Sequence, residues 1–234
     1  MIKKKRYSAL LLLRKKDPFC IKLLKFISSN CKSTSVLWEK NNKKNFSIKT
    51  QFDFIISYRS SIILTTKDIS MAKIAAINLH PGPPKYRGIG CLNYALYNNV
   101  KKYGFTIHLI SRKIDYGKIL FVKYFSVNKN SNVSTLLDKT HKQCIKYSKL
   151  FFKNILNNPK KIDFYKEKFK KERWSKIIKN KKELNEFYRI KNFNLRDVNK
   201  KIRATNFRSY KPFIQIGLNK FFLKASFELA RIYF

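Results

Sequence analysis

Short apolar runs alternate with amphipathic stretches through most of this chain. The first run, residues 7–13, is apolar nearly throughout, which is typical of a strand covered on both faces. Asp17 and Pro18 follow it and predict the start of a helix over 19–29. Further strands are expected over 33–38, 52–58, 73–79, 104–110 and 119–127, and further helices over 89–98 and 133–156. Strands that alternate with helices predict an α/β fold with a Rossmann-like, mostly parallel sheet and helices on both faces.

The predicted sheet accounts for only part of the chain. We expect it to form one domain, residues 1–158. Residues 159–182 are basic and interleaved with aromatic residues, and they are expected to form a solvated linker that could alternatively touch nucleic acid. The last segment, 183–234, predicts a small appendage made of a helix over 195–203 and a hairpin over 213–223. This appendage is too short to be a second catalytic domain.

The chain is strongly basic, with 53 Lys and Arg against 13 Asp and Glu and a formal net charge of +40. One interpretation is a polyanionic partner such as tRNA, DNA or an anionic membrane. The other is biased residue usage, because Lys, Asn, Ile, Phe and Tyr share AT-rich codons and the lysines are spread along the chain. In either case the surface should attract phosphorylated substrates.

Cysteine usage and hydropathy bear on the compartment. The four cysteines show no CxxC spacing, which favours free thiols in a reducing cytoplasm and no metal site. The N-terminus is basic and then apolar, like a signal peptide. However, its apolar run 9–13 is short and is followed by Arg and Lys, so a buried first strand explains it better. No segment approaches the length of a transmembrane helix. We therefore expect a cytoplasmic protein without membrane insertion.

Residues 78–88, NLHPGPPKYRG, place polar side chains where a predicted strand ends. Strand alternation puts Asn78 and His80 on the same side. An amide beside an imidazole can donate hydrogen bonds to an oxygen that becomes negative in a tetrahedral intermediate. The alternative is a pair of polar residues at a core edge. Pro81 then begins a stiff, proline-rich turn.

Two later stretches add to this candidate site. Tyr86, Arg87 and Gly88 lead into a predicted helix, whose first backbone amides could meet an anion. Asp115 is a lone acid in a turn before a strand, where it could orient His80 or relay a proton. Alternatively, it stabilises only its own loop. No GxGxxG follows the first strand, so a dinucleotide cofactor is not expected.

The stretches NLHPGPPKYRG, GFTIHLI and IDYGKIL, in this order and spacing, resemble the formyltransferase family that uses 10-formyltetrahydrofolate. The resemblance is strong over residues 50–125 and weak beyond residue 130. It implies that Asn78, His80 and Asp115 are catalytic. A primary amine would attack the formyl carbon, the first two residues would stabilise the oxyanion, and the carboxylate would orient the imidazole and help to move the amine proton. No metal would be needed.

The same resemblance implies supporting roles for other residues. Backbone contacts to the folate are expected from Ser57, Tyr58 and Arg59. His108 and Gly117 are expected to support the catalytic side chains. A loop that contacts the acceptor is expected to comprise Pro81, Tyr86, Arg87 and Gly88. His141, on the predicted long helix, carries no such signal and is expected to be structural or exposed.

The chain ending bears on the acceptor amine. Methionyl-tRNA formyltransferases, as the resemblance implies, carry a longer C-terminal barrel domain, and they commonly have Ser-Leu-Leu-Pro where Gly-Pro-Pro stands here. The short ending around 198–204 and 211–213 is similar to that of nucleotide-sugar formyltransferases. We therefore expect a nucleotide-linked amino sugar, with initiator tRNA as the alternative. A non-catalytic relative that binds nucleic acid is a third interpretation.

Aromatic residues in the tail suggest a contact. They could form a homodimer interface or pack back onto the main domain. These residues are Phe221, Phe222, Phe227, Tyr233 and Phe234.

Overall fold

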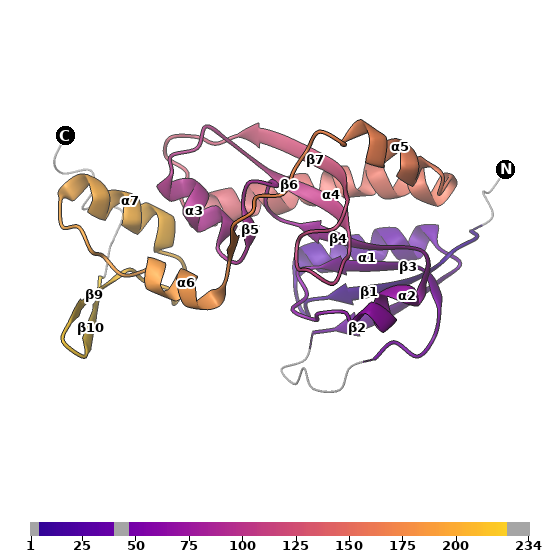
Figure 1. Ribbon diagram of the computed structural model, residues 1–234, viewed down its shortest axis with the longest axis horizontal. Coiled ribbons are helices and arrows are strands. Elements are labelled where there is room, and N and C mark those ends of the chain that lie inside the picture. The colour runs from indigo at the N-terminus through magenta and orange to yellow at the C-terminus, as the bar shows by residue number, and fades with distance from the viewer. Residues whose placement is uncertain (1–4, 40–46, 224–234) are drawn as a thin grey trace. The chain divides into compact units, whose positions relative to one another are not determined.

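A six-stranded sheet forms the core of the computed structural model, which describes residues 5–39 and 47–223 (Figure 1). The strands follow the order β2-β1-β3-β4-β6-β7. Their bounds are β1 Ser8–Leu13, β2 Ser33–Trp38, β3 Phe52–Tyr58, β4 Ala72–His80, β6 Lys102–Leu109 and β7 Ile119–Ser126. The pairs β1/β2, β1/β3 and β3/β4 are parallel, and β6 pairs antiparallel with β4. The predicted mostly parallel α/β sheet is confirmed.

Apolar side chains cover both faces of the sheet. On one face Leu11 and Leu13 pack in a cluster with residues of α1 (Pro18–Asn30), α4 (Val133–Asn157) and α5 (Lys161–Lys168). On the other face Leu10 and Leu12 pack with residues from around α2 (Thr66–Ser70). Because both faces are covered, β1 has to be apolar at consecutive positions, as the sequence shows.

The start of α1 is fixed by its sequence. Asp17 Oδ1 accepts hydrogen bonds from the backbone N–H groups of Phe19 and Cys20, both at 3.0 Å, and Pro18 occupies the first helical turn. These are the features of a helix N-terminus, since a capping side chain satisfies amides that have no partner within the helix.

The chain folds into two compact units that are not contiguous in sequence. The first unit holds the described residues of 1–85 together with 104–123 and 140–174. The second unit holds 86–103 and 124–139 together with the described residues from 175 onward. The predicted domain boundaries at residues 158 and 182 stay a prediction.

The second unit is built from short elements. They are β5 (Arg87–Gly88), α3 (Cys91–Tyr97), β8 (Ile178–Lys179), α6 (Lys181–Phe187), α7 (Leu195–Thr205), β9 (Phe213–Ile216) and β10 (Asn219–Phe222). Helix α3 packs on α7, and the Asn93 amide donates to the Ala204 carbonyl at 2.6 Å. Strand β5 pairs with β8, and β9 pairs with β10. The helix and hairpin predicted for the tail are present.

Part of the expected solvated linker is folded. Residues 161–168 form α5, in which Ile162 and Tyr165 are buried because their spacing places both on one face of the helix. The ring centroid of Tyr165 lies 4.8 Å from that of Phe151 on α4. Because this segment is rich in basic residues, the sequence did not predict its buried apolar face.

The proposed dimer contact lies partly outside the described residues, which include neither Phe227 nor Tyr233 nor Phe234. Phe221 and Phe222 are exposed, and a homodimer stays a prediction. Across residues 5–39 and 47–223, no helix combines the length and the apolar character that crossing a membrane requires.

Candidate functional site

Three polar residues lie in one row across neighbouring strands. In the register of the sheet Ser57 of β3 pairs with Asn78 of β4, and Asn78 pairs with His108 of β6. Paired residues on adjacent strands point to the same face. The row lies near the carboxyl ends of β3 and β4, which is the edge where α/β sheets bind ligands.

The amide of Asn78 lies between two acceptors. Its Nδ2 atom is 3.1 Å from His108 Nε2 and 3.4 Å from Asp115 Oδ1. His108 Nδ1 is 2.7 Å from the carbonyl oxygen of Leu109, which can only accept, so Nδ1 carries a proton. In the neutral ring Nε2 therefore accepts a hydrogen bond from Asn78.

The carboxylate of Asp115 lies between His80 and His108. Oδ2 lies 3.4 Å from His80 Nδ1, and Oδ1 lies 3.6 Å from His108 Nε2. All three side chains are at most 9% exposed. The structure thus brings together the predicted catalytic residues Asn78, His80 and Asp115, and it places His108, expected as a supporting residue, directly beside two of them. Water is largely excluded from this group, which strengthens electrostatic interactions within it.

The turn that carries Asp115 has little conformational latitude. Asp115 has φ +46°, in the left-handed region that Asp tolerates better than most residues. At Gly117 a Cβ atom would lie 1.7 Å from the backbone oxygen of Leu109, so only glycine allows the turn to approach β6 this closely. The close approach explains why glycine stands here, and the predicted support of the catalytic side chains by Gly117 stays a prediction.

Trp174 borders the group and was not anticipated. Its indole N–H donates to the Gly117 carbonyl at 2.7 Å. Its ring meets His80 and His108 edge-on, with centroid distances of 5.7 and 5.0 Å. Tryptophan is rare in this chain, with two residues. That rarity was the only feature of the sequence that pointed to Trp174. It was overlooked because Trp174 lies in a basic segment that was expected to be a solvated linker.

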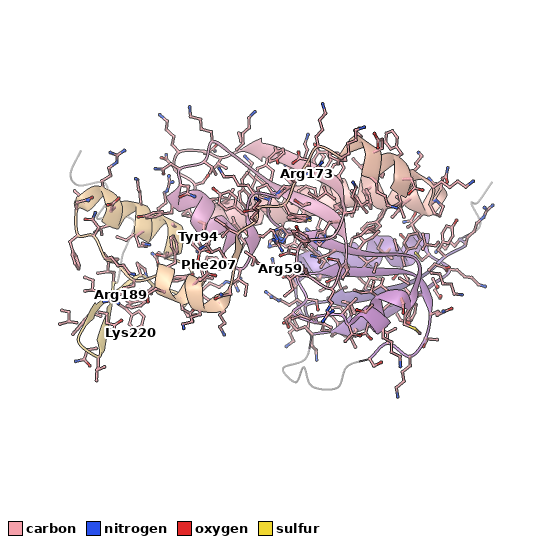
Figure 2. All side chains as sticks on the ribbon, in the orientation of Figure 1. Arg59, Tyr94, Arg173, Arg189, Phe207 and Lys220 are labelled. Atoms are coloured by element: carbon pink, nitrogen blue, oxygen red, sulfur yellow. The ribbon has the colours of Figure 1, made fainter. Side chains whose placement is uncertain are left out.

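A hollow of about 200 Å³ lies against the indole of Trp174. It is lined by residues of the Asp115 turn and of the segment after α5, including Tyr116, Phe169 and Arg173, the last marked in Figure 2. Over the part of the chain that the structure describes, no group of three or more His, Cys, Asp or Glu residues could hold a metal ion.

The end of β3 is held by a buried polar network. Arg59 has φ +55°, and its Nε atom lies 2.9 Å from Asp17 Oδ2 (Figure 2 marks Arg59). Arg59 also hydrogen-bonds His141 on α4. The hydroxyl of Tyr58 lies 2.7 Å from His141 Nδ1. Burial is the main reason that the pKa of Tyr58 is raised well above its usual value.

The three predicted folate-binding residues do not share one environment. Ser57 lies in the polar row beside Asn78, whereas Tyr58 and Arg59 belong to the buried network. Tyr58 is completely buried within the core, so its side chain faces away from the row that contains Ser57 and Asn78. His141 is buried rather than exposed, and it links α4 to the end of β3. Of the two expectations for His141, structural or exposed, the structural one holds. Its partners were not predicted, since nothing in the sequence pairs it with residues more than eighty positions earlier.

The expected acceptor loop belongs to both units. Pro81 lies in the first unit, where the next residue, Gly82, accepts a hydrogen bond at 2.8 Å from Thr106 of β6. The second unit contains Tyr86, Arg87 and Gly88.

Packing contacts within the second unit explain why Arg87 and Gly88 occupy their positions. Arg87 donates to the Ser175 carbonyl at 3.0 Å and is buried. Gly88 has φ +81°, and a Cβ atom there would lie 2.1 Å from the Lys179 carbonyl oxygen. The predicted contact between this loop and an acceptor stays a prediction.

Comparisons with known proteins bear on the family and the fold of this chain. A sequence model of the family described as "Formyl transferase" matches residues 12–149. A methionyl-tRNA formyltransferase of Lactiplantibacillus plantarum is 34% identical over 93 residues, which are 39% of this chain and 29% of that protein. The match thus spans less than a third of the length of this curated relative.

Solved structures share the fold over nearly the whole chain. A 4-N formyltransferase from Francisella tularensis has a TM-score of 0.71 at 18% identity, covering 93% of this chain and 96% of that one. An N-formyltransferase from Helicobacter canadensis, in complex with folinic acid and dTDP-3-aminofucose, has a TM-score of 0.62 at 19% identity, covering 91% and 85%.

Proposed function

This chain belongs to the formyl transferase family, and from that premise we propose that it transfers a formyl group from 10-formyltetrahydrofolate to a primary amine. The observation that carries the proposal is the group of Asn78, His80, His108 and Asp115, in which both histidines are buried and Asn78 is half-buried. It places an amide and an imidazole beside a carboxylate at the edge of the sheet. Hydrogen-bond donors arranged in this way stabilise the oxyanion of acyl transfer.

The proposed reaction assigns one role to each of three residues. The lone pair of the amine forms a bond to the formyl carbon while the carbonyl electrons move onto oxygen. His80 donates a hydrogen bond to that oxyanion, and Asn78 donates a second one with the N–H that contacts Asp115 at 3.4 Å before the substrate binds. When the carbonyl re-forms, the bond from the formyl carbon to N10 of the folate breaks and N10 takes up a proton. The attacking nitrogen loses a proton, which Asp115 accepts or relays.

The two histidines serve this reaction differently. Asp115, at 3.4 Å, stabilises the protonated form of His80 in a buried setting. A protonated ring carries hydrogen on both nitrogens, so Nδ1 can face the carboxylate while Nε2 faces the substrate oxygen. His108 donates from Nδ1 to a backbone carbonyl and orients Asn78 from Nε2. We therefore assign His108 a positioning role.

The folate would lie along the carboxyl ends of β3 and β4. Ser57 stands beside Asn78 in the register, so a ligand that reaches the amide also passes the backbone of β3. Tyr58 can contribute only its backbone, because its side chain is in the core. Arg59, held by Asp17, fixes the path of the chain where it leaves the strand.

As acceptor we propose the amino group of a nucleotide-linked sugar. The fold shared with the Helicobacter protein in complex with dTDP-3-aminofucose supports this acceptor. The positive charge suits a diphosphate. Initiator tRNA is the second candidate, favoured by the 34% identity to a methionyl-tRNA formyltransferase.

The four cysteines are buried and free, which supports a location in a reducing cytoplasm.

Release of tetrahydrofolate tests the proposal. Purified protein is incubated with 10-formyltetrahydrofolate and either a panel of nucleotide-linked amino sugars or charged initiator tRNA. We expect turnover with a sugar, and Asn78→Ala and His80→Ala should each lower kcat/KM about 10²-fold or more, as for the loss of an oxyanion donor. Asn130→Ala, at an exposed turn, is the matched control and should leave kcat/KM unchanged.

Other outcomes separate the alternatives. Turnover with tRNA alone would replace the sugar by the second candidate. Full turnover in His80→Ala would show that the assigned group is not the catalytic one. No turnover with either acceptor, together with nucleic-acid binding that both substitutions leave intact, would favour a binding protein.

A further inference from the structure

The second unit contains a pocket of about 550 Å³ that the proposed reaction does not use. Its walls come from α3, β8, α6, the segment after α6, and α7. Pockets for small ligands usually measure 300–1,000 Å³, so this one has the size for a single nucleotide but not for a folded nucleic acid. Figure 2 marks Tyr94 on α3 and Arg189 after α6, which both line it.

One wall of this pocket is aromatic. Phe187 lies 4.5 Å from Tyr94 and 5.3 Å from Tyr97 between ring centroids. The hydroxyl of Tyr94 is buried and has no hydrogen-bond partner among the described residues. Burial, with Glu183 as the next cause, raises the pKa of Tyr94 to about 12, so this hydroxyl keeps its proton. A buried hydroxyl normally has a partner, and a ligand oxygen would supply one here.

Charged side chains line the same pocket. Three carboxylates face five cations, which are Lys179, Lys182, Arg189, Lys191 and Lys201. The carboxylates already have partners. Glu183 pairs with Lys179 at 2.8 Å, Glu186 with Lys191 at 3.0 Å, and Asp197 accepts from the Asn192 amide at 2.7 Å. The remaining charge is positive and therefore favours an anion.

Two of the cations differ in what they can offer to a ligand. Lys201 donates to the Phe187 carbonyl at 2.7 Å, and its ammonium lies 3.7 Å from the centroid of that ring. It is therefore part of the wall. Lys182 is exposed and makes no ion pair within the part of the chain that the structure describes. Among the described residues, the Arg189 side chain makes one ion pair, with Glu186 at 3.8 Å. These two can turn toward a phosphate.

We propose that this pocket binds a nucleoside diphosphate, with the nucleoside against Tyr94 and Tyr97 and the phosphates at Lys182 and Arg189. The size, the aromatic wall, the unsatisfied hydroxyl and the surplus of cations each fit that class of ligand. The inference does not rest on formyl transfer, because none of these residues belongs to the group around Asp115. A binding measurement without folate therefore tests it separately.

Isothermal titration of the full chain with UDP, dTDP, GDP and inorganic diphosphate tests the proposal. We expect a nucleoside diphosphate to bind more tightly than inorganic diphosphate. Lys182→Glu should weaken nucleotide binding about tenfold or more, since it replaces a charge-assisted contact by repulsion. Lys181→Glu is the matched control, because Lys181 is the exposed neighbour on α6 that does not line the pocket. This variant should stay within about twofold of the native chain.

Tyr94→Phe is a second variant that keeps the ring and removes the unsatisfied hydroxyl. We expect it to fold normally and to weaken nucleotide binding about threefold to tenfold, as for one lost hydrogen bond. Nucleotide binding that neither Lys182→Glu nor Tyr94→Phe alters would overturn the proposal. Equal affinity for inorganic diphosphate would overturn the nucleoside part, and no binding of any probe would overturn the whole.

Discussion

At the scale of single residues, backbone geometry determines where the chemistry can occur. Asp115 reaches His80 only because its turn runs close to β6, and that approach depends on the missing side chain of Gly117. The same turn supplies the carbonyl to which Trp174 donates. The left-handed backbone conformation of Asp115 and the missing side chain of Gly117 thus determine where the carboxylate lies.

Gly117→Ala tests this dependence. The added Cβ would overlap the Leu109 carbonyl oxygen, so the turn must shift and carry Asp115 with it. We expect the free energy of unfolding to fall by about 1–3 kcal/mol, as in overpacked sites, and kcat/KM to fall as well. Gly217→Ala is the control. Gly217 has φ +57° and open space around it, so that variant should lose only the conformational term, about 1 kcal/mol, and no activity. A Gly117→Ala protein with native activity would contradict the argument.

Trp174→Phe tests the neighbour of the two histidines. Phenylalanine keeps an aromatic ring beside His80 and His108 but cannot donate to the Gly117 carbonyl. One such hydrogen bond contributes about 0.5–1.5 kcal/mol, so we expect kcat/KM to fall about threefold to tenfold. Unaltered kinetics, measured by tetrahydrofolate release, would mean that the indole N–H does not position the turn.

At the scale of elements, one side chain joins a helix to a strand end. Asp17 caps α1 with one carboxylate oxygen and binds Arg59 after β3 with the other. The pair is nearly buried, with 9% and 15% of the side chains exposed. His141 of α4 contacts both Tyr58 and Arg59. Three elements therefore meet at the carboxyl end of β3, where the folate is proposed to bind.

Two substitutions at Asp17 separate its two contributions. Asparagine caps helices about as well as aspartate, so Asp17→Asn removes mainly the charge that faces Arg59. We expect that variant to lose about 2–4 kcal/mol of unfolding free energy in a urea titration, because a nearly buried cation is left unpaired. Asp17→Ala should lose about 1 kcal/mol more, the typical worth of a helix cap. Equal stability of the two variants would show that the cap contributes nothing.

At the scale of the whole molecule, buried thiols link stability to pH. Burial is the main cause that raises the pKa of Cys20 and of Cys144 from 9.0 to about 12, and that of Cys31 to about 11. Above pH 9 the unfolded chain loses these protons while the folded chain keeps them. Folding is therefore opposed as the pH rises, because the unfolded state then binds fewer protons.

Urea unfolding at a series of pH values tests this linkage. The stabilisation should be complete below about pH 9 and lost progressively as the pH rises toward about 12. Cys144→Ala should show a shallower decline than the native chain, because one titrating thiol is absent. A steeper or identical decline in that variant would show that Cys144 does not contribute.

Local pattern was sufficient to predict the strands of the six-stranded sheet and the longer helices, but not the short helices α2, α5 and α6. The strands and the longer helices lie within a few residues of their predicted bounds, because burial imposes a period of two or of 3.6 residues on neighbouring positions. Asn78 and His80 could be placed on one side of a strand for the same reason. Their association with Asp115 came from resemblance to a family, since spacing alone left the alternative of a loop-stabilising acid open.

Tertiary structure alone placed Trp174, His141 and the pocket of the second unit. Trp174 follows a segment whose composition favours solvent, yet it packs on two histidines that are far away in sequence. His141 meets Tyr58 across the core, and the pocket combines α3 with α6 and α7. Such contacts depend on how distant segments close on one another. The sequence by itself determined the strands of the main sheet, the longer helices and the edge of the sheet that carries the polar row, because those follow from neighbouring residues. The partners that complete each site were decided by packing between distant parts of the chain.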